Sequence, residues 1–64
     1  MRETKTQDPE TGLWYREIIY NNYKRLRELK FQYDELGIRS WLNVWDPITN
    51  EWILTIEMGK NYAR

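Results

Sequence analysis

Carboxylates are the side chains of this sequence best suited to chemistry, because the chain has neither cysteine nor histidine. The closest carboxylate pair is Asp34-Glu35, but adjacent residues of a helix point in different directions and do not converge on one substrate. Asp46, Thr49 and Glu51 offer oxygen ligands for a cation, yet Asp46 opens an Asp-Pro turn, where its side chain is expected to bond the backbone. We therefore predict no catalytic residues, no metal site and no cofactor, and we expect that the protein is not an enzyme.

Charge recognition is the second chemistry that the side chains offer. Ten basic and ten acidic residues give a formal charge of zero, which argues against a non-specific nucleic-acid-binding protein. Residues 16–30 nevertheless hold five cations and two anions, whereas residues 31–58 hold one cation and five anions. This pattern predicts a basic helix beside an acidic hairpin. If the partner were a nucleic acid, the cations expected to contact phosphate are Lys24, Arg25, Arg27 and Lys30.

Apolar residues recur at steps of three and four through the middle of the chain, which predicts an amphipathic helix that ends at Gly37. Its core stripe is Ile19, Tyr23, Leu26, Leu29, Tyr33 and Leu36. A second stripe, at helical spacing beside the first, combines two aromatic residues with two cations, a mixture typical of partner-binding surfaces. The alternative is a wide amphipathic helix whose basic side chains cover apolar surface. The stripe consists of Tyr20, Lys24, Arg27 and Phe31.

The start of this helix has two interpretations. Asp8-Pro9-Glu10 matches an N-cap followed by proline at the first helical position, which predicts a helix over 9–36 after an N-terminal arm at 1–8. Asp8 to Gly12 also matches a hairpin turn between two strands, Thr4–Gln7 and Leu13–Ile19. We favour the helix, because the first of these strands would be almost wholly polar.

A β-hairpin is predicted over 38–58, with its turn at residues 46–50. A six-residue loop that pairs Asp46 with Glu51 places Trp45 opposite Trp52, Asn43 opposite Leu54 and Trp41 opposite Ile56. The tryptophans then share one face of the hairpin. We expect this face to pack against the helix, and the alternative is an exposed aromatic platform of the kind that single-strand binders use.

The segment from Trp45 to Trp52 resembles the second hairpin of the immunoglobulin-binding domain of streptococcal protein G, whose six-residue loop also begins with Asp and carries Thr. The resemblance covers only this hairpin and implies no function. If the first turn is also a hairpin, the order ββαββ resembles the β-grasp fold of that domain. A polar first strand is a poor match for the central strand that this fold requires.

Aliphatic residues on the other face of the hairpin suggest a second buried surface, at Leu42, Val44 and Ile53. A two-stranded sheet is marginal alone and leaves both edges open, so a homodimer would cover this patch or pair the edges. Scattered surface hydrophobics are the alternative.

The sequence as a whole predicts one small α+β domain at 1–64, in which a long helix precedes an antiparallel hairpin and 59–64 form a flexible tail. With no signal-peptide pattern and no long apolar run, we expect a cytoplasmic protein that does not bind membranes. We expect it to be a non-catalytic protein-interaction module, an accessory or regulatory protein that occupies the surface of a protein partner. A nucleic-acid binder that uses the basic helix is the alternative.

Overall fold

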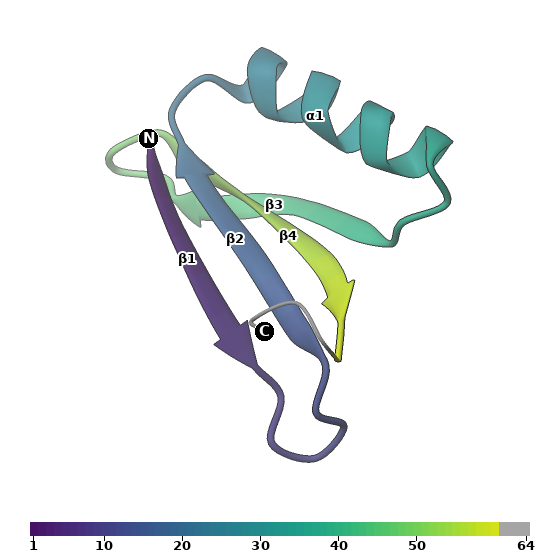
Figure 1. Ribbon diagram of the computed structural model, residues 1–64. Coiled ribbons are helices and arrows are strands. Elements are labelled where there is room, and N and C mark those ends of the chain that lie inside the picture. Colours follow the sequence, from purple (N-terminus) through teal and green to yellow (C-terminus); the bar gives the residue numbers. More distant parts are fainter. Residues whose placement is uncertain (61–64) are drawn as a thin grey trace.

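Four antiparallel strands and one helix make up the fold in the computed structural model, which describes residues 1–60. The helix lies on one face of the sheet, over the half that β3 and β4 form, and no element within residues 1–60 covers the opposite face, called the uncovered face below (Figure 1). The strand order across the sheet is β1-β2-β4-β3. In chain order the elements are β1 (Arg2–Gln7), β2 (Trp14–Tyr20), α1 (Tyr23–Glu35), β3 (Ser40–Asp46) and β4 (Glu51–Gly59).

The first twenty residues form a hairpin, so the prediction of an N-terminal arm followed by a helix over 9–36 is wrong. Asp8 Oδ1 accepts a hydrogen bond from the Glu10 N–H at 2.9 Å, and Gly12 has φ +74°. The Asp8 N–H then donates to the Leu13 carbonyl at 2.9 Å. An aspartate before proline accepts a hydrogen bond from a backbone N–H two or three residues later, both in a turn and at a helix start. The Asp8-Pro9 sequence is therefore compatible with a hairpin and with a helix.

The helix begins at Tyr23 because Asn22 caps it: Asn22 Oδ1 accepts the Arg25 N–H at 3.1 Å. Its predicted end is confirmed. Gly37 has φ +74°, its N–H donates to the Asp34 carbonyl at 3.1 Å, and the Ile38 N–H donates to the Tyr33 carbonyl at 2.9 Å. These two bonds form a Schellman motif, which glycine stabilises because it adopts this backbone conformation without strain.

The β-grasp alternative is correct in its element order and wrong in its strand order. The sheet places β1 at an edge, with β2 and β4 antiparallel at the centre. Every residue of β1 is exposed. A strand this polar does not suit the centre of the sheet, where a strand has a neighbour on each side and packs one face against the core.

The β3–β4 register differs from the prediction by one residue. Asp46 pairs with Glu51 as expected, but a β-bulge lies between Val44 and Asp46, so that Val44 pairs with Trp52. Further along, Trp41 lies opposite Thr55 and not opposite Ile56. A shift of one residue exchanges the two faces of a strand.

The core lies between the helix and the covered face of the sheet. It is centred on Leu26 of α1, which is fully buried, and on three strand residues, Ile18, Leu54 and Ile56. Trp52, Leu29 and Tyr33 pack against this cluster, as predicted. The prediction that Trp41 and Trp45 are also buried there is wrong, because the bulge directs β3 differently. The surrounding partly buried residues are Tyr20, Leu29, Tyr33, Ile38, Leu42, Trp52 and Met58.

The two hairpin turns share one local sequence, Asp-Pro-x-Thr-(Gly or Asn)-x-Trp, at 8–14 and 46–52. In the second turn Asp46 Oδ1 accepts the Ile48 N–H at 2.9 Å, and Asn50 has φ 58°. The hydrogen bond and the left-handed residue therefore recur at matching positions of both turns. Across residues 1–60, no helix has the length and apolar character that crossing a membrane requires.

Candidate interaction surface

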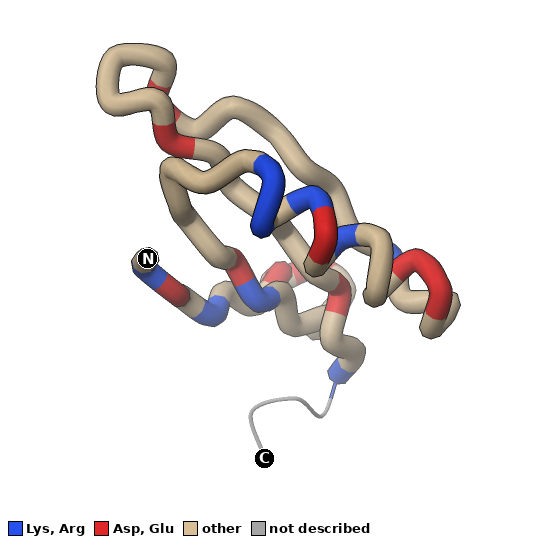
Figure 2. The backbone as a smooth tube through the Cα atoms, turned by 90° about the horizontal axis from the view of Figure 1, so that it is seen from above, with Lys and Arg blue, Asp and Glu red and all other residues tan. Residues whose placement is uncertain are grey.

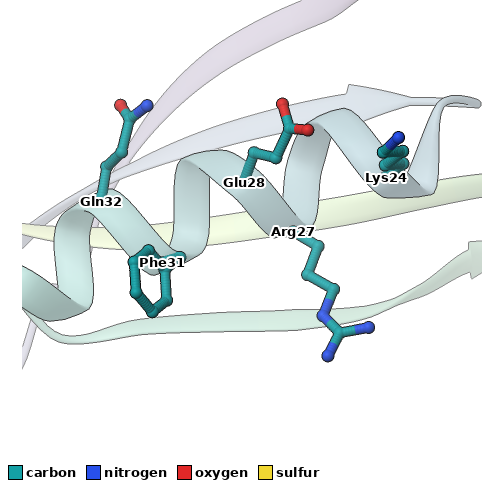
Figure 3. Close-up of a pocket in the computed structure, with 5 residues that line it drawn as sticks. All are labelled: Lys24, Arg27, Glu28, Phe31 and Gln32. Atoms are coloured by element: carbon teal, nitrogen blue, oxygen red, sulfur yellow. The ribbon is translucent and has the colours of Figure 1, made fainter.

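Large apolar side chains are exposed mainly on the side of the molecule that β3 forms. On this strand, Trp41 is 38% exposed, Val44 53% and Trp45 50%. Phe31, on the helix, is 62% exposed, and together with Arg27 it projects over β3 (Figure 3). The other exposed large hydrophobic residues among those described are Met1, Tyr23, Leu36 and Ile48.

The uncovered face of the sheet carries an aromatic cluster with a cation. The rings of Tyr15 and Trp41 lie 6.3 Å apart at 55°, and Arg39 Cζ lies 5.4 Å from the centre of the Trp41 ring. Beside them, Ile19 and Ile53 face each other across β2 and β4 and are only 7% and 8% exposed. The face therefore has an apolar centre with aromatic rings and a guanidinium at its β3 side.

Acidic side chains surround this cluster. Alternation along β2 and β4 places Glu17, Glu51 and Glu57 on the same face as Ile19 and Ile53. Arg2 Nη2 pairs with Glu51 Oε1 at 3.1 Å and so bridges from β1 to β4, whereas Glu17 accepts a hydrogen bond from Thr4. The face thus combines three carboxylates with two guanidinium groups, those of Arg2 and Arg39.

The predicted helix stripe is only partly present. Tyr20 belongs to β2 and packs against the core, so it does not lie on the helix. Lys24, Arg27 and Phe31 do share the outer face of α1. With Glu28 and Gln32 they line an open hollow of about 490 Å³ to which no other element contributes a residue (Figure 3).

Two of the four cations expected to contact phosphate are engaged within the helix. Arg25 pairs with Glu28 at 3.5 Å, and Lys30 pairs with Asp34 at 3.0 Å. Lys24 and Arg27 make no ion pair with any residue from 1 to 60. Figure 2 shows the basic residues toward the first half of α1 and acidic residues on both sides of the β3–β4 turn. The hairpin of β3 and β4 is acidic as predicted, but α1 carries four basic and three acidic residues, so only its first half is basic.

The predicted patch of Leu42, Val44 and Ile53 is divided between the two faces. Leu42 pairs with Leu54 and Val44 with Trp52, which places both on the helix side, whereas Ile53 lies on the uncovered side. The prediction assumed a regular register, and the bulge at Trp45 invalidates that assumption. The three residues cannot form one continuous surface.

Sequence reasoning missed the partnership of Tyr15 with Trp41 and Arg39. One signal was present: Arg39 and Trp41 are two residues apart, and such residues point to the same side of an extended chain. The position of Tyr15 on the sheet could not be predicted while residues 9–36 were assigned to a helix.

One shifted pKa, that of Glu3, and no group of metal ligands are found among the described residues. The pKa of Glu3 is lowered from its ordinary value of 4.5, chiefly because Arg16 donates a hydrogen bond to its carboxylate. No group of three acidic, cysteine or histidine side chains within residues 1–60 is placed to hold a metal ion. What the arrangement offers is non-covalent contact through aromatic rings, aliphatic groups and charge.

Comparison with known proteins found no matching family model, no matching curated protein and no matching solved structure.

Proposed function

We propose that the protein is a small non-catalytic interaction module that binds a protein partner on the uncovered face of its sheet. The observation that carries this proposal is the cluster of Trp41, Tyr15 and Arg39 on that face. Tryptophan, tyrosine and arginine are the residue types that contribute most to protein binding, since each contributes a large contact area together with a polar or charged group. Such a module acts by occupying its partner's surface.

The charges of this face favour a basic partner. Glu17 lies on it with Thr4 and Thr55 opposite in the strand register, whereas Glu57 lies opposite Arg39 and Glu51 is paired with Arg2. A partner that presents an apolar group to Trp41 and a cation to Glu17 would be complementary in both respects. Three carboxylates against two guanidinium groups leave this face with a negative balance of charge, which disfavours a nucleic acid there.

Affinity capture with paired variants tests the proposal. The full chain, Trp41→Ala and Ile48→Ala serve as baits in a host lysate treated with nuclease, and bound proteins are identified by mass spectrometry. Ile48 is a matched control because it is 93% exposed but lies in the β3–β4 turn. We expect one protein to be retained by the full chain and by Ile48→Ala and to be lost with Trp41→Ala. Equal recovery of every bound protein by both variants would contradict the proposal.

A nucleic-acid binder is the second candidate, and one observation favours it: Lys24 and Arg27 lie beside Phe31 on the outer face of α1, with no ion pair to residues 1–60. Binding through these residues would weaken steeply with salt, because phosphate contacts release counterions. Charge reversal by Lys24→Glu with Arg27→Glu would then abolish binding, whereas Trp41→Ala would leave it unchanged. This pattern distinguishes the two candidates.

A further inference from the structure

We propose that a second copy of this chain pairs with the free edge of β3, which joins two four-stranded sheets into one continuous antiparallel sheet. This inference concerns the edge of the sheet, and because Trp41 belongs to both surfaces, its tests change Val44 and Asn43 and leave Trp41 intact.

The two edges of the sheet differ in how they are protected. An edge strand presents unpaired backbone groups, and charged side chains are a common defence against unwanted pairing. Within β1, Arg2, Glu3 and Lys5 are charged and exposed. Within β3, the only charged residue is Asp46, at the end of the strand. The bulge at Trp45 protects only the end of β3, so the uncharged stretch from Ser40 to Val44 is the edge open to another strand.

The sequence of β3 is nearly symmetric about its centre. It reads Ser-Trp-Leu-Asn-Val-Trp-Asp, so the residues on either side of Asn43 match in type. Antiparallel pairing of two copies about Asn43 would place Leu42 opposite Val44 of the second copy, and would bring Trp41 near Trp45 of the second copy, which lies in the bulge. A two-fold interface uses the same patch on both subunits, and a strand whose two halves match meets this condition.

Each of these pairings covers side chains that the monomer leaves exposed. Trp41 is 38% exposed, Val44 53% and Trp45 50%. Because of the two-fold symmetry, the contact between Trp41 and Trp45 and the contact between Leu42 and Val44 each occur twice in the dimer. Cross-strand contacts of this kind stabilise a sheet. The charges are compatible as well, because Arg39, next to Ser40, would lie near Asp46 of the second copy.

The helices permit this arrangement. Adjacent strands lie about 4.8 Å apart, and α1 covers two strands, so two helices related by the two-fold axis would be separated by about 10 Å. This is close to the distance at which helices pack, roughly 8–10 Å. Phe31 projects over β3 and is 62% exposed, so the pairing would bring it to the seam between the copies (Figure 3).

Sedimentation equilibrium of the pure full chain between about 1 and about 100 µM tests the dimer, because mass action couples association to concentration. We expect the mass to rise toward twice the chain mass of 8.0 kDa. Val44→Lys should remain at the chain mass, and Thr4→Lys, a matched change on the opposite edge strand, should still dimerise. Circular dichroism verifies that both variants are folded.

A cysteine placed on the two-fold axis tests the register. The chain has no cysteine, so Asn43→Cys under mild oxidation can cross-link only to itself. Directly opposed residues of antiparallel strands have Cα atoms roughly 4.5–5.5 Å apart, within disulfide range. Val44→Cys is the control, because two copies of residue 44 would lie off the axis and beyond that range. We expect Asn43→Cys to cross-link at least about ten times faster.

A wild-type chain that stays at the monomer mass would overturn the dimer and leave the capture experiment to decide the proposed function. A dimer in which the two cysteine variants cross-link at equal rates, or that survives Val44→Lys, would overturn the β3 seam.

Discussion

Leu26 is the residue on which the packing of α1 against the sheet depends. It is fully buried and contacts the central cluster of the core. Leu26→Ala should lower the free energy of unfolding by about 2–5 kcal/mol, since it removes apolar contacts and leaves a cavity. Leu36→Ala is the control, because Leu36 is 71% exposed and should change stability little. Urea denaturation measures both, and equal effects of the two variants would contradict the packing.

The tryptophans should differ in their access to solvent. Trp41 and Trp45 are exposed, whereas Trp52 is partly buried, with the Tyr23 ring 4.6 Å away. In dilute protein, Trp41→Phe and Trp45→Phe should each remove emission that acrylamide quenches readily, and Trp52→Phe should remove emission that it quenches poorly. Uniform quenching across the three variants would show that the bulge does not expose β3 as described.

Asn50 stabilises the β3–β4 turn through its backbone conformation. Its φ of 58° lies in the left-handed region, which asparagine and glycine tolerate and β-branched residues do not. Asn50→Val should destabilise the protein by about 1–2 kcal/mol. Asn50→Gly should be neutral or stabilising in thermal denaturation. A melting temperature that Asn50→Val leaves unchanged would refute this assignment.

The β1–β2 hairpin should carry a small pH dependence through Glu3. Arg16 lowers the pKa of Glu3 from 4.5, so the folded state favours the ionised carboxylate. The resulting stabilisation is fully present above pH 4.5 and is lost as the pH falls through the lower, folded-state pKa. The pair is largely exposed, so the effect should stay below about 1 kcal/mol. Unfolding measured against pH should show a shallower acid loss for Glu3→Gln than for the wild type.

At the level of elements, the sequence predicted a boundary correctly where a residue type at that position is compatible with only one local structure. Gly37 marked the helix end correctly, and the Asp46–Glu51 pair marked the second turn. Asp8 was ambiguous, because its bond to the backbone serves a turn and a helix start equally well. Trp45 was misleading, since nothing in its type announces a bulge. The extra residue in the bulge places Trp41 on the uncovered face of the sheet, where the prediction had placed it against the helix. The candidate site therefore differs from the predicted one.

The whole molecule should bind duplex DNA weakly or not at all at physiological salt. Its formal charge is zero, and two of the basic residues of α1 are paired within the helix. Few cations remain to release counterions from a phosphate backbone. Fluorescence anisotropy with a labelled duplex measures this. Tight binding that falls steeply with salt would instead support the nucleic-acid candidate.

The strand order could not be predicted from local patterns, because it depends on β2 meeting β4 across the whole intervening chain. Ile18 and Ile19 are both buried, one on each face of β2, and a central strand of this kind lacks the alternation that identifies a strand in the sequence. Ile19 instead matched the helical repeat of the predicted core stripe. The polarity of β1 was the one feature that pointed correctly to its place at the edge.

The repeated Asp-Pro-x-Thr turn has a consequence for the order of folding. Each turn brings together two strands that are neighbours in the chain, and hairpins of this kind close within about 1–10 µs. The β2–β4 pairing must instead close a loop that contains α1 and β3, at a larger cost in chain entropy. We therefore expect the docking of two early hairpins along β2 and β4, with Leu26 packing over the junction, to be the step that sets the folding rate.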